Sequence, residues 1–148
     1  MFTHILIPTD GSEISATATQ GALALAKIHK ARVTVMLASP TFRQMAEEGY
    51  LLPGLQMDKK DWEAAATTRA HKVLDDVAAK AASVGVKCDT VHVFKDMPHA
   101  AILDTAKKQG CDVIVMASHG YGGFKQWVLG SETTRVLSQS KIPVLVYR

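Results

Sequence analysis

Glycine and hydroxyl residues near the C-terminal end of the chain form the pattern best suited to chemistry. Gly120 is followed by nine residues and then by Gly130 and Ser131, where a helix is predicted to begin. Glycine lets backbone N–H groups approach an anion closely because it has no Cβ, and the first N–H groups of a helix have no partner within it. The pattern predicts a phosphate site at a helix N-terminus, and the long excursion after Gly120 would reach around a polyphosphate.

This pattern differs from the common phosphate loops. The P-loop requires G-x-x-x-x-G-K-[ST] after the first strand, whereas Lys125 stands elsewhere in the glycine-rich segment. The dinucleotide fingerprint G-x-G-x-x-G is also missing after the first strand. The phosphate prediction therefore rests on the start of the helix itself.

A short carboxylate supplies a second candidate group. Asp10 stands in the stretch PTDGSE, directly after the first apolar run. From the end of a strand its side chain can reach a ribose hydroxyl or the edge of an adenine. Asp10 can equally cap the helix that follows, and the two interpretations are compatible.

Five short apolar runs rich in β-branched residues are the predicted strands. The first, fourth and fifth are nearly continuous in apolar residues, which is typical of parallel strands covered on both faces. The third alternates apolar and polar residues, which favours an edge position. The predicted strands are His4–Pro8, Arg32–Ala38, Lys87–Phe94, Asp112–Ala117 and Ile142–Tyr147.

Helical patterns lie between these strands. The predicted helices are Ser12–His29, Asp58–Val84, Met97–Gln109 and Ser131–Gln139. We expect Ser12 and Ser131 to be N-caps, and both Val136 and Leu137 to face inward. The alternation predicts an α/β fold of the Rossmann-like kind, an open, doubly wound, five-stranded parallel sheet with helices on both faces.

One irregular segment, Thr41–Met57, interrupts the alternation. It is long for a connection without secondary structure, and such loops are often functional. Its apolar residues would cover a site or a partner. A partly ordered excursion explains the segment equally well.

Composition limits the remaining possibilities. The chain has 148 residues, which fits one domain over residues 1–148. Its 17 basic residues are scattered and the net charge is only +3, which argues against a nucleic-acid surface. No apolar run reaches the roughly 18 residues of a membrane span. With two cysteines and no leader pattern at the N-terminus, we expect a reduced, cytoplasmic protein.

The residues around the glycine-rich segment resemble the universal stress protein family. Its nucleotide-binding members carry G-2x-G-9x-G-[ST], and here Ala117, Gly120, Gly130 and Ser131 stand at those positions. Ala117 replaces the first glycine of the motif. The PTDGSE turn and the C-terminal IPVLVYR stretch also resemble the family, and the resemblance covers essentially the whole chain.

The resemblance implies strand order 3-2-1-4-5 and an adenine nucleotide, ATP or its relatives AMP and ADP, at the carboxyl ends of the strands. Mg²⁺ or Mn²⁺ would be held mainly by the phosphates. A homodimer would form through Ile142–Tyr147, and in this strand order Cys88 and Cys111 would be free thiols. The residues implied to contact the nucleotide are Pro8, Thr9, Asp10, Ala38, Met116, Ala117, Gly120, Gly130, Ser131, Glu132 and Thr133.

No catalytic residue and no protein metal site is predicted. Ser118 and His119 are adjacent, which does not provide the geometry of a nucleophile and its base. His119 would act near a phosphate or merely position the backbone. The leading hypothesis is a nucleotide-binding regulatory protein of the stress response, with at most slow ATP hydrolysis.

Three other functions remain open from the sequence. The main alternative is a dimeric interaction module with a vestigial nucleotide site. An adenylating or phosphoryl-transferring enzyme would need a catalytic base or a second substrate domain, and neither is visible. A phosphoacceptor receiver domain would need paired acids after the first strand and a lysine after the fifth, whereas the chain offers Asp10 and ends at Arg148.

Overall fold

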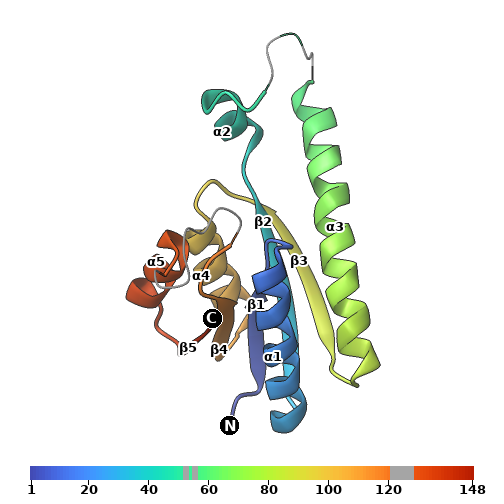
Figure 1. The fold of residues 1–148 in the computed structure, drawn as a ribbon, viewed down its shortest axis with the longest axis vertical. Coiled ribbons are helices and arrows are strands. Elements are labelled where there is room, and N and C mark those ends of the chain that lie inside the picture. Colours follow the sequence, from blue (N-terminus) through green and yellow to red (C-terminus); the bar gives the residue numbers. More distant parts are fainter. Residues whose placement is uncertain (52–53, 55–56, 121–128) are drawn as a thin grey trace.

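The computed structural model describes residues 1–51, 54, 57–120 and 129–148. Its strands and helices alternate along the chain as predicted, with one additional short helix (Figure 1). The elements are β1 (His4–Pro8), α1 (Glu13–His29), β2 (Arg32–Ser39), α2 (Phe42–Glu47), α3 (Lys59–Ser83), β3 (Cys88–Phe94), α4 (Pro98–Gln109), β4 (Val113–Ala117), α5 (Ser131–Gln139) and β5 (Val144–Tyr147).

The five strands form one parallel sheet in the order β3-β2-β1-β4-β5. At the centre of the sheet, Ile5 of β1 pairs with Val33 of β2 on one side and with Val113 of β4 on the other. Strand order reverses between β1 and β4, which is where ligands bind in sheets of this kind. The predicted fold class and strand order are confirmed.

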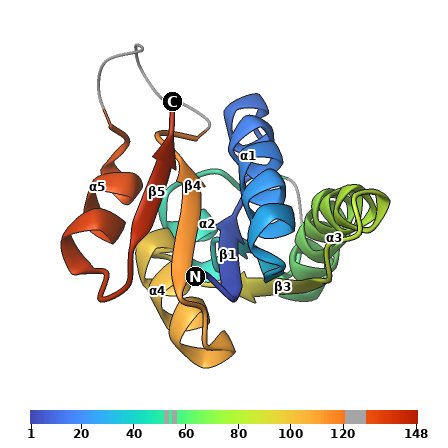
Figure 2. The same ribbon diagram turned by 90° about the horizontal axis from the view of Figure 1, so that it is seen from below.

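Helices cover both faces of the sheet. Figure 2 shows α1 and α3 on one face and α4 and α5 on the other. Successive strand residues point to opposite faces, so Ile5 and Ile7 belong to the core beneath α1 and α3, while Leu6 packs in the core beneath α4. At one edge β3 is only half-buried, as its alternating sequence predicted.

Helix ends follow local capping chemistry. Ser12 caps α1 by accepting a hydrogen bond from the Ser15 N–H (3.3 Å), as predicted. The prediction that Ser131 caps α5 is wrong, because Gly130 is the N-cap and its carbonyl accepts the first helical hydrogen bond, from the Thr134 N–H (3.0 Å). Leu137 is also misassigned. It is 42% exposed, whereas its neighbour Val136 is fully buried, because successive helical residues do not share a face.

Two predicted segments need new boundaries. The fifth strand begins at Val144 rather than Ile142, because Pro143 lacks an N–H and the Ser140 hydroxyl bonds both the N–H and the carbonyl of Ile142 (3.2 and 2.7 Å). The segment Thr41–Met57 contains α2, whose N-cap Thr41 accepts a hydrogen bond from a backbone N–H within the helix. Residues 52–53 and 55–56 of this segment lie outside the described residues.

Close packing joins the last strand to the first helix. A Cβ built at Gly21, in the middle of α1, would lie 2.0 Å from Cζ of Tyr147 on β5. Glycine weakens a helix interior, so its presence here is explained by the aromatic ring that occupies its side-chain position. The two cysteines are free thiols, as expected. In the part of the chain that the structure describes, every helix is too short or too polar to cross a bilayer.

Candidate functional site

A cavity of about 470 Å³ opens where the strand order reverses, at the carboxyl ends of β1, β2 and β4. Its volume is within the range of small-molecule sites. Every residue that the sequence analysis implied for nucleotide contact lines it: Pro8, Thr9, Asp10, Ala38, Met116, Ala117, Gly120, Gly130, Ser131, Glu132 and Thr133. The sequence analysis did not include five further lining residues: Ser15, Met36, Pro98, Ile102 and His119.

The inner wall of the cavity is apolar. Met36 comes from β2 and Met116 from β4, on either side of β1, and Ile102 comes from α4. All three belong to the buried core beneath α4, so the site continues the core outward rather than lying on the surface. Flat, polarizable ligands such as purine rings fit surfaces that contain methionine and branched side chains.

The turn after β1 fixes Asp10 at the mouth of the cavity. Its Oδ1 accepts a hydrogen bond from the Ser12 N–H (2.9 Å), and the Thr9 hydroxyl accepts one from the Gly11 N–H (3.2 Å). The helix cap is Ser12 and not Asp10, so the capping interpretation of Asp10 is replaced by a tight side-chain turn.

The Asp10 carboxylate occupies the space where a side chain at position 120 would lie. A Cβ built at Gly120 would lie 2.1 Å from Oδ2 of Asp10, which is far inside a normal contact. Glycine at position 120 therefore allows the Asp10 carboxylate to take this position. The sequence pattern alone did not indicate this role.

The start of α5 presents backbone donors to the cavity. The first intrahelical N–H is that of Thr134, so the N–H groups of Ser131, Glu132 and Thr133 precede the helical hydrogen-bond ladder. The helix dipole adds positive potential at this end, so these three groups are the donors that the predicted anion site requires.

Two other hydrogen-bond donors near the start of α5 already donate to backbone carbonyls of the protein. The Gly130 N–H donates to the carbonyl of Ser118 (2.8 Å), and the Thr133 hydroxyl donates to the carbonyl of Ala117 (3.1 Å). These bonds tie the start of α5 to the end of β4. A Cβ at Gly130 would lie 3.2 Å from Cα of His119, so glycine also permits this close approach of the two segments.

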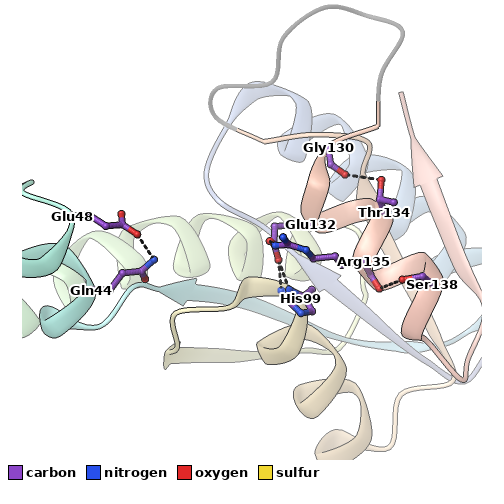
Figure 3. Close-up of polar contacts among 8 residues, drawn as sticks. All are labelled: Gln44, Glu48, His99, Gly130, Glu132, Thr134, Arg135 and Ser138. Atoms are coloured by element: carbon purple, nitrogen blue, oxygen red, sulfur yellow. Dashed lines mark hydrogen bonds and ion pairs between the residues drawn. The ribbon is translucent and has the colours of Figure 1, made fainter.

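Glu132 connects the two helices that border the cavity (Figure 3). Its Oε2 accepts hydrogen bonds from the His99 N–H (2.7 Å) and contacts Nδ1 of His99 (2.8 Å), while its Oε1 pairs with Arg135 (2.6 Å). Since Met97 offers no side-chain cap, Glu132 satisfies the start of α4 from another helix. Partial burial raises the pKa of the Glu132 carboxyl, but the hydrogen bonds from His99 and Arg135 outweigh it and hold that pKa below its ordinary value.

Comparison with known proteins agrees with this geometry. The model of the universal stress protein family matches residues 1–148. The chain belongs to the universal stress protein family. Universal stress protein YxiE of Bacillus subtilis is 30% identical over 156 residues, which cover the whole of both chains.

Solved structures of other universal stress proteins have the same fold. The structure of MJ0577, from Methanocaldococcus jannaschii, superposes with a TM-score of 0.83 at 27% identity, covering 99% of this chain and 95% of that one. A universal stress protein in complex with cAMP (20% identical, TM-score 0.67) and the Archaeoglobus fulgidus protein in complex with dAMP (16% identical, TM-score 0.70) each cover 99% of this chain and 97% and 98% of their own.

Polar side chains in this universal stress protein do not assemble into a recognisable catalytic centre within the described residues. His119 lines the cavity, and its Nδ1 lies 3.0 Å from the Ser118 hydroxyl, a contact between neighbours that also fits a role in positioning the backbone. Across residues 1–51, 54, 57–120 and 129–148, no three His, Cys, Asp or Glu side chains group as metal ligands.

The lining residues on α4 were missed for a physical reason. Pro98 and Ile102 stand in the predicted helix Met97–Gln109, and their spacing suits an ordinary core-facing helix. The usable signal was Pro98, which starts a helix at the same edge of the sheet as Asp10 and Gly130. A helix that begins at the reversal point necessarily borders the ligand crevice.

Proposed function

We propose that this universal stress protein, as a single domain over residues 1–148, binds ATP, or AMP or ADP, and acts as a regulatory protein rather than a rapid enzyme. The adenine lies against Met36, Met116 and Ile102, with Ala38 beside it. The Asp10 carboxylate accepts hydrogen bonds from the ribose hydroxyls. Its turn holds the carboxylate in place before the ligand arrives, which reduces the cost of ordering it on binding.

In this proposal the phosphates lie at the start of α5. The N–H groups of Ser131, Glu132 and Thr133 donate to phosphate oxygens, and the Ser131 hydroxyl adds a further donor. Mg²⁺ or Mn²⁺ would be held mainly by the phosphates. The Glu132 carboxylate is engaged by His99 and Arg135, so its negative charge is partly compensated near the bound anion.

One observation carries this proposal. Four separate stretches of the chain match a nucleotide-binding pattern, and their residues line a single cavity. The cavity includes the start of α5, which has no side-chain cap. The cAMP and dAMP complexes of universal stress proteins with the same fold support an adenine nucleotide as the ligand class.

Titration calorimetry with ATP and Mg²⁺ tests the proposal. We expect saturable binding with a Kd of about 1–100 μM, and weaker binding of adenosine, which lacks the phosphates. GTP is the matched control for the base. An absence of heat up to millimolar ATP, with the protein shown to be folded by circular dichroism, would contradict the proposal.

A vestigial nucleotide site is the second candidate function. It is favoured by the use of the Gly130 N–H and the Thr133 hydroxyl within the protein (2.8 and 3.1 Å), which leaves fewer donors for a phosphate than the motif suggests. In this case the protein is an interaction module. The same calorimetry separates the two candidates, because only the vestigial site predicts no binding of any adenine nucleotide.

We also propose that the protein is a homodimer that pairs through the stretch Ile142–Tyr147. Among the described residues, the strand within it, β5, has a neighbouring strand on one side only, β4, so its other edge presents backbone groups that a second copy can satisfy. Leu145 on β5 and Leu137 on α5 are 37% and 42% exposed. Pairing of two β5 edges would cover apolar surface as well as backbone.

A cytoplasmic location is part of the same proposal. Cys88 and Cys111 are free, and burial raises the pKa of Cys111 to about 11 and raises that of Cys88. Both therefore remain in the unreactive thiol form at neutral pH. Such thiols suit a reducing compartment, and fractionation of the source cells tests this assignment.

A further inference from the structure

A second and larger cavity lies on the opposite face of the sheet, between α1 and α3. Its volume is about 1040 Å³. The two helices run side by side in the same direction over this face (Figures 1 and 2), and β2 contributes Leu37 to the floor. Thr9, Asp10 and Ala38 border both cavities, so the groove reaches the edge of the nucleotide site.

The interior of the groove is largely apolar, with Thr19 and Gln20 as polar residues on the α1 side. Leu23 on α1 and Val77 on α3 are each 5% exposed and form the deep wall, while Val73 is half-buried higher on the same helix. Ala16 and Ala24 line the α1 side with small side chains. A long groove with apolar walls suits an extended hydrocarbon.

The rim of the groove is cationic. Among the described residues, Lys27, Arg69 and Lys72 have no carboxylate within ion-pair distance. Lys80 also lines the groove but pairs with Asp76 (2.6 Å). Three uncompensated cations beside an apolar floor complement a ligand with a negative head and a hydrocarbon tail.

We propose that this groove is a binding site for a long-chain fatty acid. The acyl chain lies along the floor between Leu23 and Val77, and the carboxylate pairs with Arg69 or Lys72 at the rim. Burial of each methylene contributes about 0.8 kcal/mol, so affinity grows with chain length until the groove is filled. The groove runs beside α1, whose 17 residues span roughly 25 Å, a length that suits a long chain.

The volume favours an acyl chain over a protein helix as the occupant. A helix about 10 Å wide and as long as α1 encloses roughly 2,000 Å³, about twice the volume of the cavity. Such a helix would therefore stand mostly outside the groove. An extended acyl chain is narrow enough to lie within the groove, against its apolar floor.

Fluorescence titration of the full chain with cis-parinaric acid tests this proposal. We expect saturable binding in the low micromolar range, about 1–10 μM, and displacement of the probe by palmitate but not by hexadecylamine, whose head is cationic. Failure of cis-parinaric acid to bind at about 100 μM, or equal displacement by palmitate and hexadecylamine, would overturn the proposal.

Matched variants locate the binding. Ala24→Trp fills the groove from an exposed helix position, and Ala79→Trp places the same side chain on an exposed position of α3 outside the groove. We expect the first to weaken probe binding at least tenfold and the second to leave it within twofold, estimates at the scale of about 1.4 kcal/mol per tenfold. Equal affinity in the two variants would overturn the proposal.

Other occupants give distinct results. A change in sedimentation caused by Ala24→Trp alone would show that a second copy of the chain fills the groove. Tighter binding of an acidic amphipathic helical peptide than of palmitate would assign the groove to a protein partner. Either result would overturn the fatty-acid assignment. ATP calorimetry on Ala24→Trp keeps this test independent of the nucleotide proposal, because that variant leaves the other cavity unchanged.

Discussion

Asp10 and Gly120 approach each other so closely that a single methyl group cannot fit between them. The space beside the Asp10 carboxylate is the side-chain position of Gly120, at 2.1 Å from Oδ2. Each residue therefore has a role that depends on the other. The pairing makes a sharp test of whether Asp10 contacts the nucleotide.

We predict that Gly120→Ala weakens ATP binding about tenfold with little loss of stability, because the Asp10 side chain moves aside rather than the backbone. Asp10→Ala should weaken binding by a similar factor. The double variant should bind no more weakly than Asp10→Ala, because the displaced group is then gone. Calorimetry on the wild type, the two single variants and the double variant measures the coupling between the two residues. Additive losses of binding free energy would show that Gly120 does not act through Asp10.

Gly130→Val tests the start of α5. A branched side chain there meets Cα of His119 at close range (3.2 Å from the Cβ alone) and enters the space beside the proposed phosphate position. We expect ATP affinity to fall at least tenfold, or about 1.4 kcal/mol, while adenosine binding changes little. Gln139→Val, at an exposed position at the far end of α5, is the control. Unchanged ATP affinity in Gly130→Val would count against the phosphate position.

Glu132 gives a pH-dependent contribution to stability. Its pKa in the folded protein lies below the ordinary value of 4.5, so its bonds to His99 and Arg135 stabilise the fold above that pH. The contribution is lost as pH falls through the lowered pKa. Urea unfolding should show Glu132→Gln less stable than the wild type at pH 7, with the difference shrinking below about pH 4.5. The exposed substitution Asp75→Asn is the control, and a difference independent of pH would contradict the assignment.

Sequence reasoning at the residue scale found backbone donors more readily than side-chain partners. Gly130 and Ser131 were recognisable because a helix start binds anions wherever it occurs. The contact between Glu132 and His99 was not recognisable from the sequence, because it joins residues 33 positions apart and depends on how α4 and α5 pack. The same applies to Ile102, whose apolar side chain carries no sign of facing a cavity.

Elements were predictable where local chemistry fixes their ends. Ser12 begins α1 as its N-cap, and Gly110 ends α4 with a left-handed backbone (φ 67°). β5 begins only at Val144 because Pro143 has no N–H to donate. The continuous apolar pattern of Ile142–Tyr147 gave no sign of this later start. α2 was missed because none of its residues is buried, so no apolar periodicity marked it.

Packing between α1 and β5 yields a test at the scale of elements. Alanine normally stabilises a helix interior by about 1 kcal/mol relative to glycine, yet Gly21→Ala should destabilise this protein by about 1–3 kcal/mol through overpacking against Tyr147. In a Tyr147→Ala background the same change should become stabilising. Urea unfolding of the four proteins reports the reversal of sign. If Gly21→Ala destabilises both backgrounds equally, the ring is not the cause.

At the scale of the whole molecule, the sheet order determines where the sites lie. The alternation of strands and helices predicted the layers, and the resemblance to universal stress proteins supplied the order β3-β2-β1-β4-β5, which the structure confirms. The groove between α1 and α3 was not predictable. It depends on the distance between the two helices, and no single sequence motif encodes that distance.

The proposed dimer is also tested at this scale. Sedimentation equilibrium at micromolar concentration should give twice the mass of 16.0 kDa. Leu145→Lys places a charge on the exposed face of β5 and should shift the protein toward monomer. Ile28→Lys, at a position 77% exposed on α1, is the matched control. A monomeric wild-type protein would contradict pairing through Ile142–Tyr147.

The central claim is that the start of α5 binds the phosphates of an adenine nucleotide whose base lies against the sheet. The most direct measurement is the change in backbone amide NMR signals on titration with ATP and, separately, with adenosine. We predict that both ligands shift the signals of Ala38 and Met116, and that only ATP shifts those of Ser131, Glu132 and Thr133. Equal shifts at the α5 residues with both ligands, or none with ATP, would contradict the account.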